Sequence, residues 1–163
     1  MSVDTAHKSW WQIGEVIFGT PLLAAVILQL IAPLQFINES FSIIFLVFGI
    51  ILCIGGITLI IAARQVFSEY GQPTDPGSPT HSMVTTSVFS VSRNPMYLGT
   101  ACLLLGIALV FNLAWVFIFF IPTLVACRSI LIAPEERYLE AKFGAEYHRY
   151  ATSVFRWIGH RKR

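Results

Sequence analysis

Charge is scarce in this sequence. Only 12% of its 163 residues are Asp, Glu, Lys or Arg, whereas about a quarter of the residues of a soluble domain are charged. The net charge of +2 is too small to indicate a nucleic-acid-binding surface. Instead, 55% of the residues are hydrophobic and 13% are aromatic, and the mean hydropathy is +0.68. This composition is typical of an integral membrane protein.

Several familiar catalytic motifs are also missing. The sequence has no GxGxxG, no Walker loop, no HExxH and no GxSxG, which argues against the common nucleotide-binding, metalloprotease and hydrolase sites. Its three cysteines, Cys53, Cys102 and Cys127, form no CxxC pair. We therefore expect them to be small apolar packing residues, and we predict neither a disulfide framework nor a metal site.

Long apolar runs take the place of these features. A helix needs roughly 20 apolar residues to cross a hydrocarbon core of about 30 Å. Runs of this kind cover approximately residues 13–32, 41–63 and 113–133, and a shorter run covers 97–111. We predict an all-α polytopic membrane protein with about four transmembrane helices, the last two joined through Asn112 as a tight hairpin. Residues 1–163 then form a single membrane domain, whose first span is expected to be retained and not removed as a signal peptide.

The positive charges predict the orientation. Lys and Arg occur in the N-terminal head, around the connector 64–92 and beyond Cys127, but not in the connectors around Asn38 and Asn112. With four spans, every basic segment falls on one side of the membrane, which the positive-inside rule assigns to the cytoplasm. We expect both termini, the connector and the tail 134–163 on that side. The basic residues at the chain end are expected to meet anionic lipid headgroups.

Two polar clusters lie at the ends of predicted spans. Ser92-Arg93-Asn94-Pro95-Met96-Tyr97-Leu98-Gly99 opens the third run, and Pro95 is suited to the first turn of a helix. Glu135 and Glu136 follow the fourth run, and the tail beyond them has the pattern of an amphipathic interfacial helix. Ionisable residues at such places are costly unless they form a site, so we expect one here, facing the cytoplasm.

Arg128 lies inside the fourth apolar run and needs a partner there. It precedes Glu135 by seven residues and so shares its face of a regular helix. We expect either an internal ion pair with Glu135 or a substrate anchor.

The same residues carry a family resemblance. Arg93-Asn94-Pro95-Met96-Tyr97-Leu98-Gly99 resembles the Arg-His/Asn-Pro-x-Tyr-x-Gly motif of the isoprenylcysteine carboxyl methyltransferase family. The run from Glu135-Glu136 to Arg156-Trp157-Ile158 is similar to that family's C-terminal signature. The resemblance covers roughly residues 64–158, and related phospholipid methyltransferases and some membrane reductases share the architecture.

The resemblance implies an enzyme that transfers the methyl group of S-adenosylmethionine to a lipophilic acceptor delivered from the bilayer. It implies catalytic roles for Arg93 and Tyr97 and substrate contacts for Arg128 and Glu136. The implied cofactor-binding residues are His81, Ser82, Met83, Val84, Phe89, Asn94, Pro95, Met96, Tyr97 and Glu135.

The resemblance does not identify the methyl acceptor. Methylation of an isoprenylcysteine carboxylate is favoured, but the arginine that holds this carboxylate in the family is replaced here by Leu131, and Arg128 is the candidate substitute. The alternatives are phospholipid N-methylation, a same-fold reductase that uses NADPH, and a non-catalytic membrane scaffold. The sequence does not indicate an oligomeric state.

Overall fold

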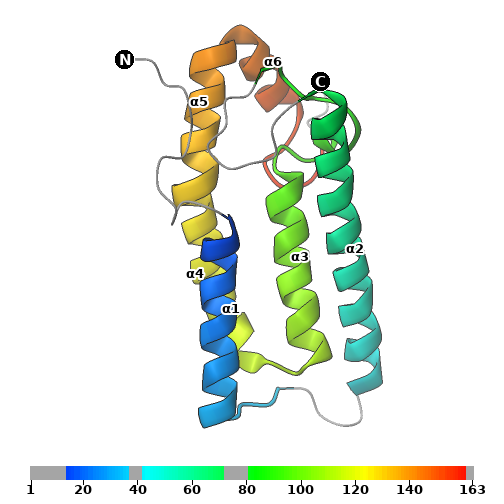
Figure 1. Cartoon of the computed structure of the whole chain (residues 1–163), viewed down its shortest axis with the longest axis vertical. Helices are drawn as coiled ribbons and strands as arrows, with labels where there is room; N and C mark the ends of the chain where they lie inside the picture. The colour runs from blue at the N-terminus through cyan, green and yellow to red at the C-terminus, as the bar shows by residue number, and fades with distance from the viewer. Residues whose placement is uncertain (1–13, 37–41, 72–80, 161–163) are drawn as a thin grey trace.

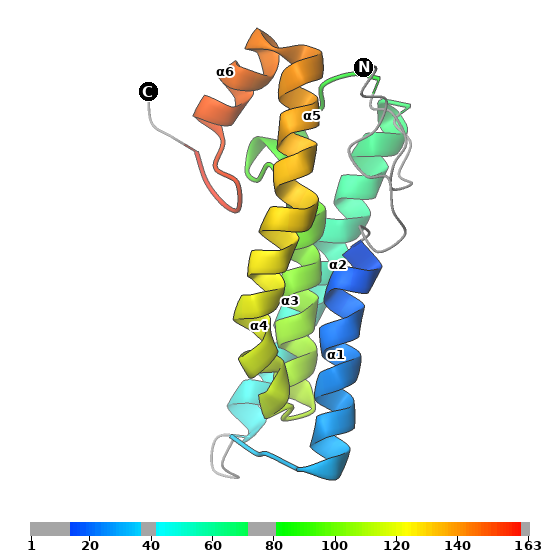
Figure 2. The same cartoon turned by 90° about the vertical axis from the view of Figure 1, so that its left-hand side faces the viewer.

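The computed structural model describes residues 14–36, 42–71 and 81–160. Four long rods stand side by side in it: α1 (Gly14–Ile31), α2 (Ser42–Glu69), α3 (Pro95–Val110) and α4 (Ala114–Ala126), the last continued by further helix (Figures 1 and 2). No β-strand occurs among the described residues, whose one isolated β-bridge joins Val154 and His160. The predicted all-α fold is confirmed. The N-terminal head, the Asn38–Glu39 connector and the Pro-rich part of the central connector lie outside the described residues.

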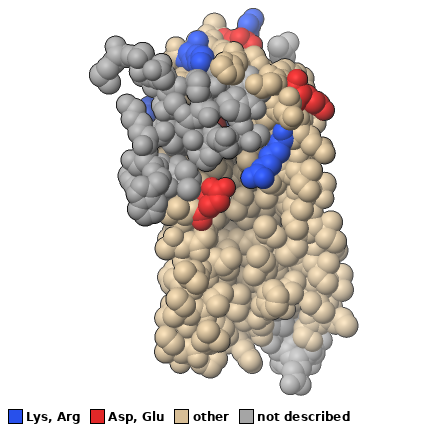
Figure 3. Space-filling view, in the orientation of Figure 1, with Lys and Arg blue, Asp and Glu red and all other residues tan. Residues whose placement is uncertain are grey.

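Three of these helices are long and apolar enough to cross a membrane: Gly14–Ile31, Ser42–Glu69 and Ala114–Phe143. Between Glu15 and Arg64, and again between Arg93 and Arg128, no described residue is charged. On the face shown in Figure 3, the charged side chains gather toward the upper end and the lower part carries none. The protein is therefore an integral membrane protein, and the charged residues that the structure describes lie toward one end of the bundle.

The hairpin between α3 and α4 is as tight as predicted. Only three residues separate the two helices, and Asn112 reverses the chain in the left-handed region with a φ of 51°. Leu113 then returns a backbone hydrogen bond to Ala108 (2.8 Å). Asparagine tolerates positive φ better than most residues, which explains how a single polar residue can turn an otherwise apolar segment.

Glycines bring α2 and α3 into close contact. A Cβ built on Gly56 would lie 2.5 Å from the Gly99 carbonyl oxygen, and one on Gly49 would lie 2.9 Å from that of Gly106. The backbones of the two helices therefore come into contact at two levels, which are two helical turns apart. Such small-residue contacts drive helix association in membranes, where lipid removes the hydrophobic incentive to pack.

Two boundaries differ from the sequence prediction. Helix α2 continues to Glu69, six residues beyond the predicted end of the span at Ala63, because Val66 and Phe67 pack into a second apolar cluster. The fourth span does not stop before Pro134 either. A π-helical turn, η3 (Cys127–Ile132), leads into α5 (Ala133–Phe143) without a break. Proline lacks the N–H of a regular ladder, and the widened turn directly before it keeps the helix continuous.

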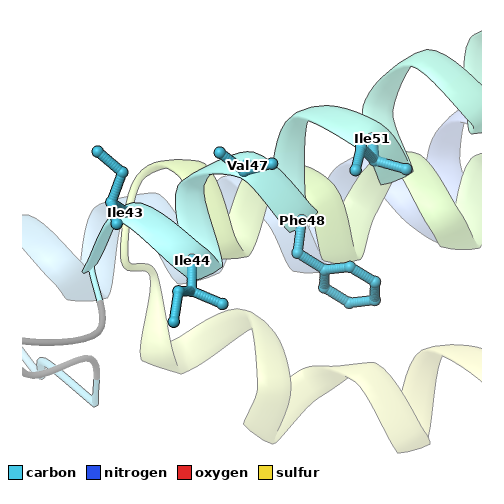
Figure 4. A pocket seen from close by; sticks show the side chains of 5 residues that line it. All are labelled: Ile43, Ile44, Val47, Phe48 and Ile51. Atoms are coloured by element: carbon cyan, nitrogen blue, oxygen red, sulfur yellow. The ribbon is translucent and has the colours of Figure 1, made fainter.

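The described pocket lies far from the charged end. It is a shallow apolar hollow on α2, lined by Ile43, Ile44, Val47, Phe48 and Ile51 (Figure 4). These side chains are exposed, with 52–69% of their surface accessible, as expected for a helix face that lipid covers. The polar chemistry of the chain is at the opposite end of the bundle.

Candidate active site

The polar cluster and the carboxylate pair meet at the charged end of the bundle. Asn94 occupies the N-cap position of α3, and Pro95 begins the helix as predicted. Tyr97 lies in its first turn and donates a hydrogen bond from its hydroxyl to Oε2 of Glu135 on α5 (3.3 Å). Tyr97 and Glu135, which are far apart in the sequence, are therefore in contact near the start of α3.

Glu136 has a different environment from its neighbour. Its carboxylate accepts two hydrogen bonds from Arg156, from Nε at 3.0 Å and from Nη2 at 2.7 Å. Nη1 of Arg93 lies 3.1 Å from the same group and also donates to the Tyr147 hydroxyl (3.2 Å). We expected Glu136 to contact the substrate. In the structure both of its oxygens are engaged by the two arginines, and the substrate contact stays a prediction.

The tail reinforces this network through the backbone. Asn94 does not cap α3 with its side chain but donates from Nδ2 to the Arg156 carbonyl (3.0 Å), while its own N–H is accepted by Ser92 Oγ (3.1 Å). Tyr147 and Tyr150 belong to α6 (Ala145–Ser153), and Tyr150 donates to the Phe89 carbonyl (2.7 Å). Arg156 and these tyrosines hold the start of α3 in place, which their positions in the sequence did not reveal.

Burial affects the tyrosines of α6. It raises the pKa of Tyr147 to about 12, an effect to which nearby Glu136 adds and which Arg93 opposes. Burial likewise raises the pKa of Tyr150. For Arg156, the hydrogen bonds to Glu136 raise the pKa of the guanidinium. Both hydroxyls therefore stay neutral across the physiological range, that of Tyr147 accepting from Arg93 and that of Tyr150 donating to the Phe89 carbonyl.

Removing the shared carboxylate tests this network. Glu136→Ala leaves two arginines without a counter-charge, and because all three side chains keep some solvent contact (15%, 20% and 32% exposed for Arg93, Glu136 and Arg156), we expect a loss of about 1–2 kcal/mol. Thermal unfolding in detergent measures it. Glu140→Ala, an exposed change on the same helix, serves as the control. Equal melting temperatures for the two variants would show that the network adds no stability.

The residues predicted to flank a cofactor form a separate apolar wall. Val84, Phe89 and Met96 pack with Ala63 and Val66 of α2. The Phe89 ring, which is 6% exposed, stacks on Phe67 with the centroids 4.9 Å apart. Ahead of this wall, His81 is exposed and Ser82 and Met83 are half-buried. Phe67 was not predicted because the sequence placed it in a connector, not on a helix.

Arg128 is not where the sequence placed it. Its side chain is exposed, and no ion pair joins it to Glu135 within the described part of the chain. The seven-residue spacing assumed a regular helix, but the π-helical turn that begins at Cys127 shifts the phase between the two residues. The expected internal pair is therefore wrong. Leu131, at the position of the family's arginine, is fully buried.

Comparison with known proteins assigns the family. A family model described as phospholipid methyltransferase matches residues 44–146. The chain belongs to the phospholipid methyltransferase family. This confirms the predicted relationship to the isoprenylcysteine and phospholipid methyltransferases, and it makes the protein a membrane methyltransferase for lipophilic substrates.

The matched segment of this phospholipid methyltransferase family member contains both polar clusters and ends within α6. An uncharacterized protein of Haemophilus influenzae is 42% identical over 65 residues, which make up 39% of this chain and all of that protein. No solved structure matches the chain significantly.

Proposed function

We propose that this methyltransferase takes its methyl group from S-adenosylmethionine, and that Glu135 binds the cofactor's ammonium group. The observation that carries the proposal is the contrast between two adjacent acids. Both ion pairs of the described residues belong to Glu136, whereas Glu135, itself partly buried, has the neutral Tyr97 hydroxyl as its hydrogen-bond partner. A partly buried carboxylate without a cation is costly, and a cationic ligand would compensate it.

The surrounding groups fit the rest of that cofactor. The first turn of a helix leaves its amides without intrahelical acceptors, so the N–H groups of Met96 and Tyr97 suit a carboxylate. Phe89, Val84 and the side chain of Met96 offer an apolar wall for adenine. When bound, S-adenosylmethionine supplies a methyl group on a sulfonium that is its own leaving group. The protein's part is then to align the acceptor and exclude water, and we assign Tyr97 and Arg93 to that alignment, Arg93 through Glu136 and Tyr147.

The depth of the site suits an acceptor from the bilayer. Helix α3 has 16 residues and is therefore about 24 Å long, which is less than the hydrocarbon thickness of about 30 Å. If the Val110 end of α3 reaches one face of the hydrocarbon core, the opposite end of the helix does not reach the other face. Tyr97, in the first turn of α3, then lies within the hydrocarbon core. The site end also carries Arg64, Arg93 and Arg128, so the positive-inside rule favours the cytoplasmic side for it.

Electrostatics favours an amine over a carboxylate as the acceptor. The position of the family's acceptor-binding arginine is Leu131, buried in the core, and Arg128 faces outward. Arg93 and Arg156 are already paired with Glu136. The place of the carboxylate-binding arginine is thus apolar in this chain, and the family model that matches residues 44–146 is that of the phospholipid methyltransferases. We propose a phospholipid amine in preference to the isoprenylcysteine carboxylate.

Product chemistry tests this preference. Proteoliposomes containing phosphatidylethanolamine and a prenylated cysteine acid are supplied with S-adenosylmethionine labelled in the methyl group. When the extracted lipids are treated with base, the N–CH3 bond of a methylated amine survives and its label stays non-volatile, whereas a methyl ester releases volatile methanol. We expect at least tenfold more of the label in the lipid extract to remain non-volatile after base treatment than to be released as methanol. Label found mainly in methanol would establish the carboxylate acceptor, and label in neither fraction would reject both.

A further inference from the structure

The last described residues form a tight turn that is attached to the start of α3. Val154 and His160 form an antiparallel bridge, and Phe155 donates its N–H to the Gly159 carbonyl (2.8 Å). Gly159 has a φ of 112°, which favours glycine. Two further backbone hydrogen bonds, Arg93 N–H to Phe155 O (3.1 Å) and Gly159 N–H to Val91 O (2.8 Å), fasten the turn to the segment before α3.

The side chains of this turn divide between two directions. Arg156 reaches Glu136 inside the protein, and Trp157 packs half-buried against the apolar core of the spans. Phe155 and Ile158 instead remain 42% and 65% exposed, and Val91, hydrogen-bonded to the turn, is 48% exposed. We call Val91, Phe155 and Ile158 the turn patch. Three backbone hydrogen bonds hold this backbone, so the exposure of these apolar side chains belongs to an ordered surface.

The turn patch lies beside the start of α3. In Figure 2 the red segment after α6 descends toward the spans and then turns back. It is hydrogen-bonded to the residues immediately before α3, a helix about 6 Å shorter than the hydrocarbon core. Trp157 packs against the apolar core of the spans, which also keeps the turn close to them. In the sequence, Arg161, Lys162 and Arg163 follow directly, and such a basic run complements anionic headgroups.

From this placement we propose that the turn patch inserts into the acyl–headgroup boundary of the bilayer next to the site, with lipid as its partner. Burying Phe155, Ile158 and Val91 in lipid removes apolar surface from water. The turn then acts as an anchor that holds Arg156 and the start of α3 at the bilayer surface. This membrane contact does not depend on the proposed cofactor or acceptor.

Depth-dependent quenching tests the insertion. Ile158→Cys is labelled with the environment-sensitive fluorophore NBD in phosphatidylcholine–phosphatidylglycerol proteoliposomes, and Phe155→Cys gives an independent second position. His148→Cys, an exposed residue of α6, is the matched control. The unsubstituted protein, labelled in parallel, gives the background from the three native cysteines. We expect at least threefold stronger quenching by lipids that carry a nitroxide near the headgroup, and at least threefold weaker quenching by aqueous iodide, at 155 and 158 than at 148.

The opposite pattern would overturn the proposal. If the labels at 155 and 158 are quenched by iodide as strongly as the label at 148, the turn patch faces water. If neither iodide nor nitroxide lipid quenches them, protein covers the patch and lipid is not its partner. Size-exclusion profiles of the labelled variants that match the parent protein establish that each reading comes from folded protein.

Discussion

Glu135→Gln is expected to weaken the binding of S-adenosylhomocysteine roughly 10- to 100-fold. Glutamine keeps an oxygen that accepts from the Tyr97 hydroxyl, the partner of Glu135 at 3.3 Å, but it removes the charge that would meet the ligand's ammonium group. A hydrogen bond between charged groups contributes about 1.5–3 kcal/mol, and each 1.4 kcal/mol corresponds to a factor of ten in affinity. Equilibrium binding of labelled S-adenosylhomocysteine to detergent-purified protein measures the change.

A control variant and a stability measurement show whether the loss of affinity is specific to Glu135. Glu140→Gln removes one exposed charge from the same helix and should leave the dissociation constant unchanged. The melting temperature of Glu135→Gln should stay within about 2 °C of the parent, because no ion pair of the described residues involves this carboxylate. Unaltered affinity in the folded variant would remove Glu135 from the binding site.

Gly56→Ala is expected to lower stability by about 3 kcal/mol. The added methyl carbon would lie 2.5 Å from the Gly99 carbonyl oxygen and 2.9 Å from the Leu103 nitrogen. Both atoms belong to the backbone, so no side-chain rotation relieves the overlap and the two helices must separate. Overpacking usually costs about 1–3 kcal/mol, and a contact with rigid backbone belongs at the upper end. For a chain of this length the loss corresponds to a melting temperature lower by about 6–12 °C.

The neighbouring residue provides the control. Gly55 is exposed, and a Cβ there would meet nothing within 4 Å. Because alanine is a better helix former than glycine, Gly55→Ala should leave the melting temperature unchanged or raise it slightly. Both variants are compared by thermal unfolding in the same detergent. If they melt alike, the close approach of α2 and α3 is not what stabilises the bundle.

The sequence predicts the fold well because a membrane leaves the chain few choices. Every backbone polar group in lipid must be satisfied within a helix, so apolar runs of sufficient length specify the spans. The positions of Pro95 and Asn112 then specify where α3 begins and where its hairpin turns. The exceptions arise where tertiary packing extends a helix, as at Phe67, or where a local defect changes its phase, as in the turn at Cys127.

The site is predictable in its location but not in its internal pairing. Motif order brings Tyr97 and Glu135 to one place, and their hydrogen bond agrees with this. No pattern tells which of two adjacent glutamates is neutralised, since that depends on Arg156, twenty residues further on, being returned by a turn to Glu136. Similarly, a spacing of seven places Arg128 beside Glu135 only while the helix between them is regular.

Calorimetric titration of the detergent-purified protein with S-adenosylhomocysteine, alongside an identical titration with NADPH, distinguishes a methyl-donor site from a nicotinamide site. We expect saturable binding of S-adenosylhomocysteine at one site per chain and no binding of NADPH. Binding of NADPH alone would assign the site to a reductase. Binding of neither ligand by protein that unfolds cooperatively would contradict the assignment of Glu135 and Tyr97 to a methyl-donor site.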